Sequence, residues 1–163
     1  MGFKMPPIPA LVGIVCAGVG LIFLIVGVAT PGWTVTSDGR YTAGLWRFCI
    51  DDTCENDDVF DTFGDYLYVC RVFGILGVLV LAGCVVVGVL MCFMKMDKLP
   101  IIAAILAFVA AFFILVEFAV YAGEDEDNQY GYSFALTIVA WLLAIAAGIC
   151  FIVGKANTGT SVA

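Results

Sequence analysis

The chain has 163 residues, of which 63% are hydrophobic and 13% are charged, and its net charge is −7. Soluble domains contain roughly 45–50% apolar residues, so the apolar excess indicates contact with lipid. The sequence contains no histidine, no serine nucleophile motif, no phosphate-binding glycine loop and no set of metal ligands. We therefore predict a membrane protein that is not an enzyme, with no catalytic residue, no metal, no cofactor and no nucleic acid partner.

Four long apolar segments divide the chain, and we predict transmembrane helices at about 9–29, 70–94, 100–122 and 132–153. Each reaches about 20 residues, the length that crosses roughly 30 Å of hydrocarbon, and none shows the alternation of a barrel strand. The first segment is longer than a signal-peptide core and lacks a cleavage site, so we expect it to be retained. The connections are outer loops at 30–69 and 123–131 and a tight turn at 95–99.

Charged residues fall unevenly on the two sides of this arrangement. The side with both termini and the turn carries four lysines and one acid, whereas the other side carries three arginines and twelve acids. The basic bias is small, but twelve carboxylates would be repelled by an anionic cytoplasmic leaflet. We predict a multi-pass plasma membrane protein with both termini in the cytoplasm. The lysines are Lys4, Lys95, Lys98 and Lys155.

Small residues recur at helical spacing in the predicted spans, where close packing must replace the hydrophobic drive that lipid removes. The third span has Ala103, Ala107 and Ala111, and the fourth has Ala140 and Ala144, followed by Gly148. We expect these two helices to approach closely. Association between copies of the chain is the alternative use of these stripes.

The first outer loop contains strand and turn signals. Residues 34–36 predict a short strand, 37–39 a turn, and 41–50 a second strand rich in aromatic and apolar residues. Cys49 and Cys54 follow at a spacing that fits a hairpin closed by a disulfide, on the oxidising side of the membrane. Two unpaired buried cysteines, or a pairing that involves Cys70, are the alternatives.

Trp33, Gly44, Leu45, Trp46, Cys49 and Cys54 together resemble a family signature. The pattern W…GLW…C…C, between the first two of four spans, is similar to that of the claudin, peripheral myelin protein and epithelial membrane protein superfamily. Arg71 at the start of the second span also matches. Residues 130–135, followed by Trp141, resemble the myelin/epithelial branch, whereas the acidic loop suits a claudin, so the branch stays open.

This resemblance implies a left-handed four-helix transmembrane bundle, an all-α membrane fold, with a small antiparallel β-sheet on the outer ends of the helices. Trp33, Leu45 and Trp46 would anchor the sheet and the disulfide would close it. Tryptophan prefers the membrane–water boundary, where we expect its N–H to stay in contact with water. Fewer residues separate the cysteines than is usual in the family, so loop contacts of claudins cannot be transferred in detail.

Glu117 is an acid within the third predicted span, a few residues from its outer end. An acid at this depth requires a partner, and Arg71 on the neighbouring span is the natural one. We therefore predict an intramembrane ion pair. The alternatives are that the Glu117 side chain reaches toward the surface, or that it belongs to an ion or proton pathway.

The first loop also carries a run of acids. It is either a solvated surface that keeps the loop out of the membrane, or a negative field that concentrates cations. The spacing lacks the pattern of a calcium-binding loop. The acids are Asp51, Asp52, Glu55, Asp57, Asp58, Asp61 and Asp65.

These observations predict a structural and interaction protein that contributes to cell–cell contact or membrane organisation through its outer loops. A lateral regulatory subunit of another membrane protein is the first alternative, and a cation path through the acidic loop or Glu117 is the second. The expected partners are the lipid bilayer and other membrane proteins or further copies of the chain. Residues 161–163 weakly fit a ligand for a cytoplasmic scaffold, and Cys92 and Cys150 are either buried or palmitoylated.

Overall fold

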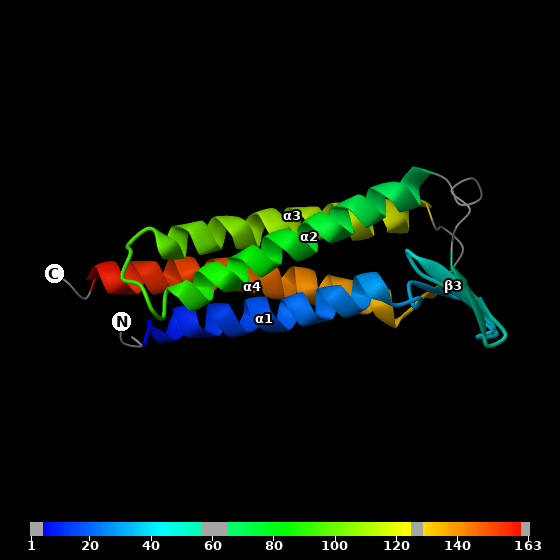
Figure 1. The fold of residues 1–163 in the computed structure, drawn as a ribbon, viewed down its shortest axis with the longest axis horizontal. Coiled ribbons are helices and arrows are strands. Elements are labelled where there is room, and N and C mark those ends of the chain that lie inside the picture. The colour runs from blue at the N-terminus through cyan, green and yellow to red at the C-terminus, as the bar shows by residue number, and fades with distance from the viewer. Residues whose placement is uncertain (1–4, 57–64, 125–128, 161–163) are drawn as a thin grey trace.

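The structure is a computed structural model that describes residues 5–56, 65–124 and 129–160. Within these residues, four helices run side by side along the long axis of the molecule (Figure 1). They are α1 (Ile8–Ala29), α2 (Asp65–Leu90), α3 (Leu99–Glu124) and α4 (Tyr132–Thr160). Each is long and apolar enough to cross a membrane, and a small antiparallel sheet lies at one end of them. The predicted fold class is confirmed.

Buried residues recur along each helix at alternating spacings of three and four. A straight α-helix has 3.6 residues per turn, so a stripe of residues with a period of 3.5 drifts slowly around it. The stripe stays in contact with the neighbouring helices when the helices wind around one another in a left-handed supercoil. The pattern therefore agrees with the predicted handedness of the bundle. In α1 the seam is Ala10, Gly13, Ala17, Gly20, Leu24 and Gly27. In α2 it is Leu67, Cys70, Gly74, Gly77, Leu81, Cys84 and Gly88.

Helix α1 packs mainly on α4, and α2 mainly on α3. Glycines at every seventh position of α1 allow this approach, since a Cβ atom at Gly27 would come within 2.6 Å of Thr137 Oγ1. We expected the alanine stripe of α4 to face α3. Instead, the backbone of Ala140 lies against Gly20 of α1, whereas Gly148 lies against Phe108 of α3. The small residues of α4 are thus divided between two neighbours.

Five short strands form the sheet in the order β4-β3-β2-β1-β5. The prediction of one strand over 41–50 is wrong, because residues 44–46 form a turn that divides it into β2 and β3. The segment at 129–130 pairs with the first strand, which the sequence analysis did not foresee. The strands are β1 (Thr34–Val35), β2 (Tyr41–Ala43), β3 (Arg47–Ile50), β4 (Thr53–Asn56) and β5 (Gln129–Tyr130).

Some helix ends differ from the predicted spans. Helix α2 begins at Asp65, inside the predicted loop, and α4 continues through Lys155 to Thr160. A helix can extend beyond the hydrocarbon, because its backbone groups remain paired in water as well. At the other end of the bundle, Cys92 is buried and Cys150 is half-buried.

Candidate functional site

The candidate site is the sheet together with the contacts that attach it to the helices. Trp33, between α1 and β1, is fully buried, and its ring lies 4.9 Å from that of Tyr121 in α3 and 5.9 Å from that of Phe134 in α4. Its Nε1–H donates to the carbonyl of Gly27 at 2.7 Å. This carbonyl belongs to the last turn of α1, where backbone acceptors lack helical partners. Trp33 is thus an anchor, but the expected water contact of its N–H is wrong.

Hydroxyl groups extend this anchor. The hydroxyls of Thr34 in β1 and Tyr121 in α3 share a buried hydrogen bond of 2.5 Å. At the start of α4, Ser133 contacts the Thr30 hydroxyl and accepts from the backbone N–H of Gly32. The connection from α1 to β1 is therefore tied to both α3 and α4. Sequence reasoning missed Thr34, Tyr121 and Ser133, because only the fold brings them together.

Each residue of the Gly44-Leu45-Trp46 motif has its own function in the turn between β2 and β3. A Cβ atom at Gly44 would come within 2.6 Å of the Pro31 Cα atom, so only glycine fits here without displacing the backbone. Leu45 is fully buried. Trp46 is 41% exposed and its ring contacts a guanidinium group, 5.1 Å from the ring centre.

That guanidinium belongs to Arg71 of α2, which donates a hydrogen bond from Nε to the carbonyl of Leu45 at 2.5 Å. Arg71 therefore attaches the Gly44-Leu45-Trp46 turn to α2 through a hydrogen bond and a cation–π contact. The predicted ion pair with Glu117 is not formed between these two described residues, since neither carboxyl oxygen has a hydrogen-bond partner. Cys70 and Gly74 face α3, and Arg71, one residue on from Cys70, points about 100° away from it.

Glu117 is instead enclosed between helices. Its side chain has no exposed surface, and its carboxyl group lies against Gly74 of α2. The alternative that this side chain reaches the membrane surface is thereby wrong. The thiol of Cys70 donates to the backbone carbonyl of Glu117, so Cys70 is a free cysteine at the helix interface.

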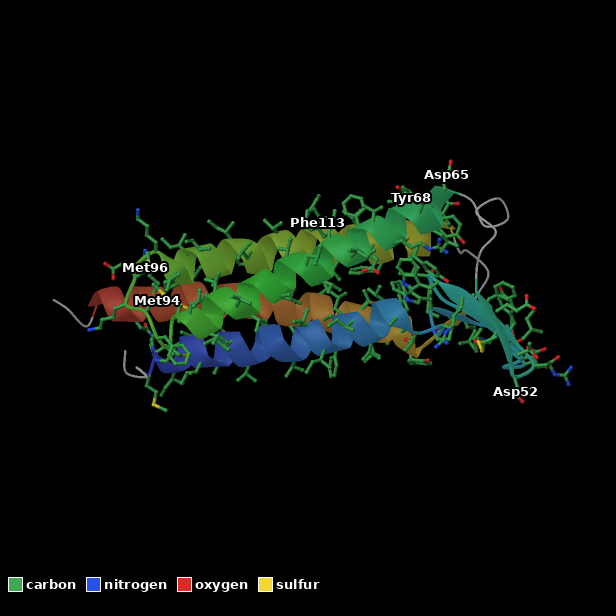
Figure 2. All side chains as sticks on the ribbon, in the orientation of Figure 1. Asp52, Asp65, Tyr68, Met94, Met96 and Phe113 are labelled. Atoms are coloured by element: carbon green, nitrogen blue, oxygen red, sulfur yellow. A yellow bond between two sulfur atoms is a disulfide. The ribbon has the colours of Figure 1, made fainter. Side chains whose placement is uncertain are left out.

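The outer tip of the sheet is the hairpin of β3 and β4. Cys49 and Cys54 lie directly opposite each other in this hairpin and form a disulfide. Asp51 and Asp52 make the connecting turn, with φ angles of 47° and 70°. Two-residue hairpin turns with positive φ at both positions match the twist of the strands, and aspartate tolerates this conformation. Figure 2 places Asp52 at the end of the molecule farthest from the chain termini.

The structure separates some of the acids that the sequence groups together. Asp51, Asp52 and Glu55 are exposed at the tip of the sheet. Asp65 is the first residue of α2 and lies apart from them, at the end of its helix (Figure 2). In the neighbouring turn between β1 and β2, the Thr36 hydroxyl donates to Asp38, which lowers the pKa of that carboxyl. Asp57, Asp58 and Asp61 lie outside the described residues.

The register of β2 and β3 gathers apolar side chains on one face. Tyr41 is opposite Ile50, and their neighbours on that face include Phe48. The rings of Tyr41 and Phe48 stack with centroids 6.5 Å apart, and Ile50 is 47% exposed. We call Tyr41, Phe48 and Ile50 the apolar patch. Arg47 lies on the opposite face of β3 and is exposed as well.

Comparison with known proteins agrees with this architecture. The lens fiber membrane intrinsic proteins of Rattus norvegicus and Mus musculus are each 30% identical to the chain over 156 residues, which cover 85% of this chain and 87% of the relative. The protein of that name from Homo sapiens is 28% identical over 156 residues, which again cover 85% of this chain and 87% of the relative. Residues 9–151 match the family described as PMP-22/EMP/MP20/Claudin. The chain therefore belongs to the PMP-22/EMP/MP20/Claudin family.

Proposed function

We propose that this protein contributes to contact between neighbouring cells, with the sheet outside the plasma membrane and both termini in the cytoplasm. The sheet projects beyond the helices, at the end opposite to the chain termini (Figure 1). The exposed acids at its tip favour the outer side, since an anionic cytoplasmic leaflet would repel them. The described lysines lie at the other end of the bundle, in agreement with the positive-inside rule.

The observation that carries the proposal is the apolar patch on a sheet that is fixed to the bundle. Aromatic side chains surrounded by polar groups are typical of the centre of a protein–protein interface. Here the stacked pair of Tyr41 and Phe48 and the exposed Ile50 lie beside the acidic turn of Asp51 and Asp52. Because anchoring by Trp33 removes much of the freedom of the sheet, binding would lose little further entropy.

The disulfide between Cys49 and Cys54 would also help to hold the apolar patch in its binding conformation. It joins the strands beside the patch and limits fraying of the hairpin that carries Ile50. Among the described strands, β4 is at the edge of the sheet and pairs with β3 alone, so a covalent link limits its fraying and keeps the binding conformation populated. The same patch accepts either another copy of this chain or a different membrane protein on the opposite cell.

The test is enrichment of tagged protein at contacts between cells that lack other adhesion proteins. We expect the unaltered protein to concentrate at contacts and Ile50→Ser to lose most of that enrichment. Arg47→Ser is the matched control, because it introduces the same residue on the opposite face of β3. Equal enrichment of the two variants, at equal surface expression, would contradict the proposal.

A further inference from the structure

A groove lies between α3 and α4 at the end of the bundle that carries the chain termini. Its volume is about 160 Å³, and its walls include Ile101, Ala104 and Ile105 of α3 and Phe151 and Ile152 of α4. An apolar cavity of roughly this size, about 150 Å³, stays dry and takes a benzene-sized group. In a bilayer, the available occupant of that kind is a segment of a lipid acyl chain.

The polar boundary of the groove is basic. Lys155, which is half-buried, is the charged residue among its described lining residues, and Pro100 in the first turn of α3 lies beside it. The N-terminus of a helix carries a partial positive charge that adds to that of an ammonium group. Lys95 and Lys98 are exposed at the same end, against one carboxylate, Asp97.

We propose that this groove binds an anionic phospholipid of the inner leaflet. One acyl chain lies between α3 and α4, against Phe151 and Ile152, and the headgroup phosphate lies beside the Lys155 ammonium. An apolar channel that ends at a positive charge matches the two parts of such a lipid. The leaflet follows from the proposed orientation, but the site itself depends neither on that orientation nor on cell contact.

The site is tested by native mass spectrometry of the full-length protein in detergent. The probes are dioleoylphosphatidylserine and the zwitterionic dioleoylphosphatidylcholine. We expect tighter binding of the serine lipid, which has a net negative charge, and we expect Lys155→Gln to weaken it about fivefold, which corresponds to roughly 1 kcal/mol per lysine. Binding of the choline lipid should be weakened less, because its phosphate is already neutralised by its own ammonium group. Lys95→Gln, at the same end but outside the groove, is the matched control and should leave both lipids bound.

The apolar part is tested by filling the groove. Ile152→Trp should weaken binding of both lipids, whereas Ile149→Trp should weaken neither, since both positions are about equally exposed on α4 but only Ile152 lines the groove. Equal effects of Lys155→Gln and Lys95→Gln would show general surface attraction and overturn the proposal. Unaltered lipid binding by the Ile152→Trp variant would also overturn the proposal. Detection of a protein dimer in place of the protein–lipid complex would overturn it as well.

Discussion

The carboxyl group of Glu117 in α3 lies against the backbone of Gly74 in α2, where an added Cβ atom would come within 2.6 Å of Oε1. Both carboxyl oxygens are buried without a hydrogen-bond partner among the described residues. A buried polar group in this state costs about 1–3 kcal/mol of stability. The contact between α2 and α3 is therefore close but unfavourable at this point.

Replacing Glu117 with methionine should stabilise the protein. Glu117→Met keeps an unbranched side chain but removes the unpartnered oxygens, so we expect the free energy of unfolding to rise by about 1–3 kcal/mol. Thermal unfolding of the purified protein in detergent measures the change. Glu117→Gln, which retains the shape and a polar group, should gain less. A lower unfolding temperature for Glu117→Met would mean that the carboxyl group makes a stabilising interaction.

The turn between β2 and β3 should not tolerate a side chain at its first residue. Gly44→Ala would place a methyl group 2.6 Å from the Pro31 Cα atom and 2.7 Å from the Thr30 carbonyl oxygen. Because these are backbone atoms, we expect a loss of about 1–3 kcal/mol, the usual cost of overpacking. Gly18→Ala is the control, since no described atom outside the adjoining turns of its own helix lies within 4 Å of its added methyl group. Equal unfolding temperatures would contradict the close approach.

The sequence predicts the bundle well because lipid imposes a simple requirement. Apolar segments of spanning length must become helices, and small residues mark where they pack. The tryptophan and GLW signals likewise identify the anchor of the sheet. The partner of Arg71 could not be predicted in this way, because it depends on the rotation of α2: Gly74 faces α3, which leaves Arg71 to face Leu45 and Trp46.

Pairing between distant segments was also beyond the sequence. Strand β5 joins the sheet where Gly131 approaches Gly32 so closely that a Cβ atom at Gly131 would overlap the Gly32 carbonyl oxygen. The sequence around either glycine does not reveal that these two backbone segments meet. The division of the predicted strand at 44–46 has a similar cause, since the contact of Gly44 with Pro31 bends the chain there.

Replacement of Arg71 by lysine should lower the stability of the protein. Arg71→Lys keeps the charge but removes the planar group above Trp46 and the Nε donor to Leu45. We expect the protein to lose about 1 kcal/mol, which lowers the unfolding temperature by roughly 2–4 °C. Arg47→Lys, on an exposed position of β3, should change it little. Identical melting of both variants would show that the guanidinium contacts do not stabilise the sheet.

Loss of the disulfide should loosen the tip of the sheet and leave the bundle folded. The Cys49→Ser/Cys54→Ser variant opens a short loop, for which chain entropy predicts a cost of about 2 kcal/mol. Trypsin added to intact cells should then cleave after Arg40 or Arg47 several-fold faster. The free Cys16→Ser change serves as the control. Unaltered cleavage of the double variant would mean that the strands hold the hairpin closed without the bond.

The placement of the sheet outside the cell is tested most directly by epitope tags in unpermeabilised cells. A tag inserted after Gly39 is suitable, because no described residue other than its two chain neighbours lies within 4 Å of a Cβ atom added to Gly39. We predict that antibody labels this tag in intact cells and labels tags at either terminus only after permeabilisation. Labelling of a terminal tag in intact cells, or of the Gly39 tag only after permeabilisation, would contradict the account.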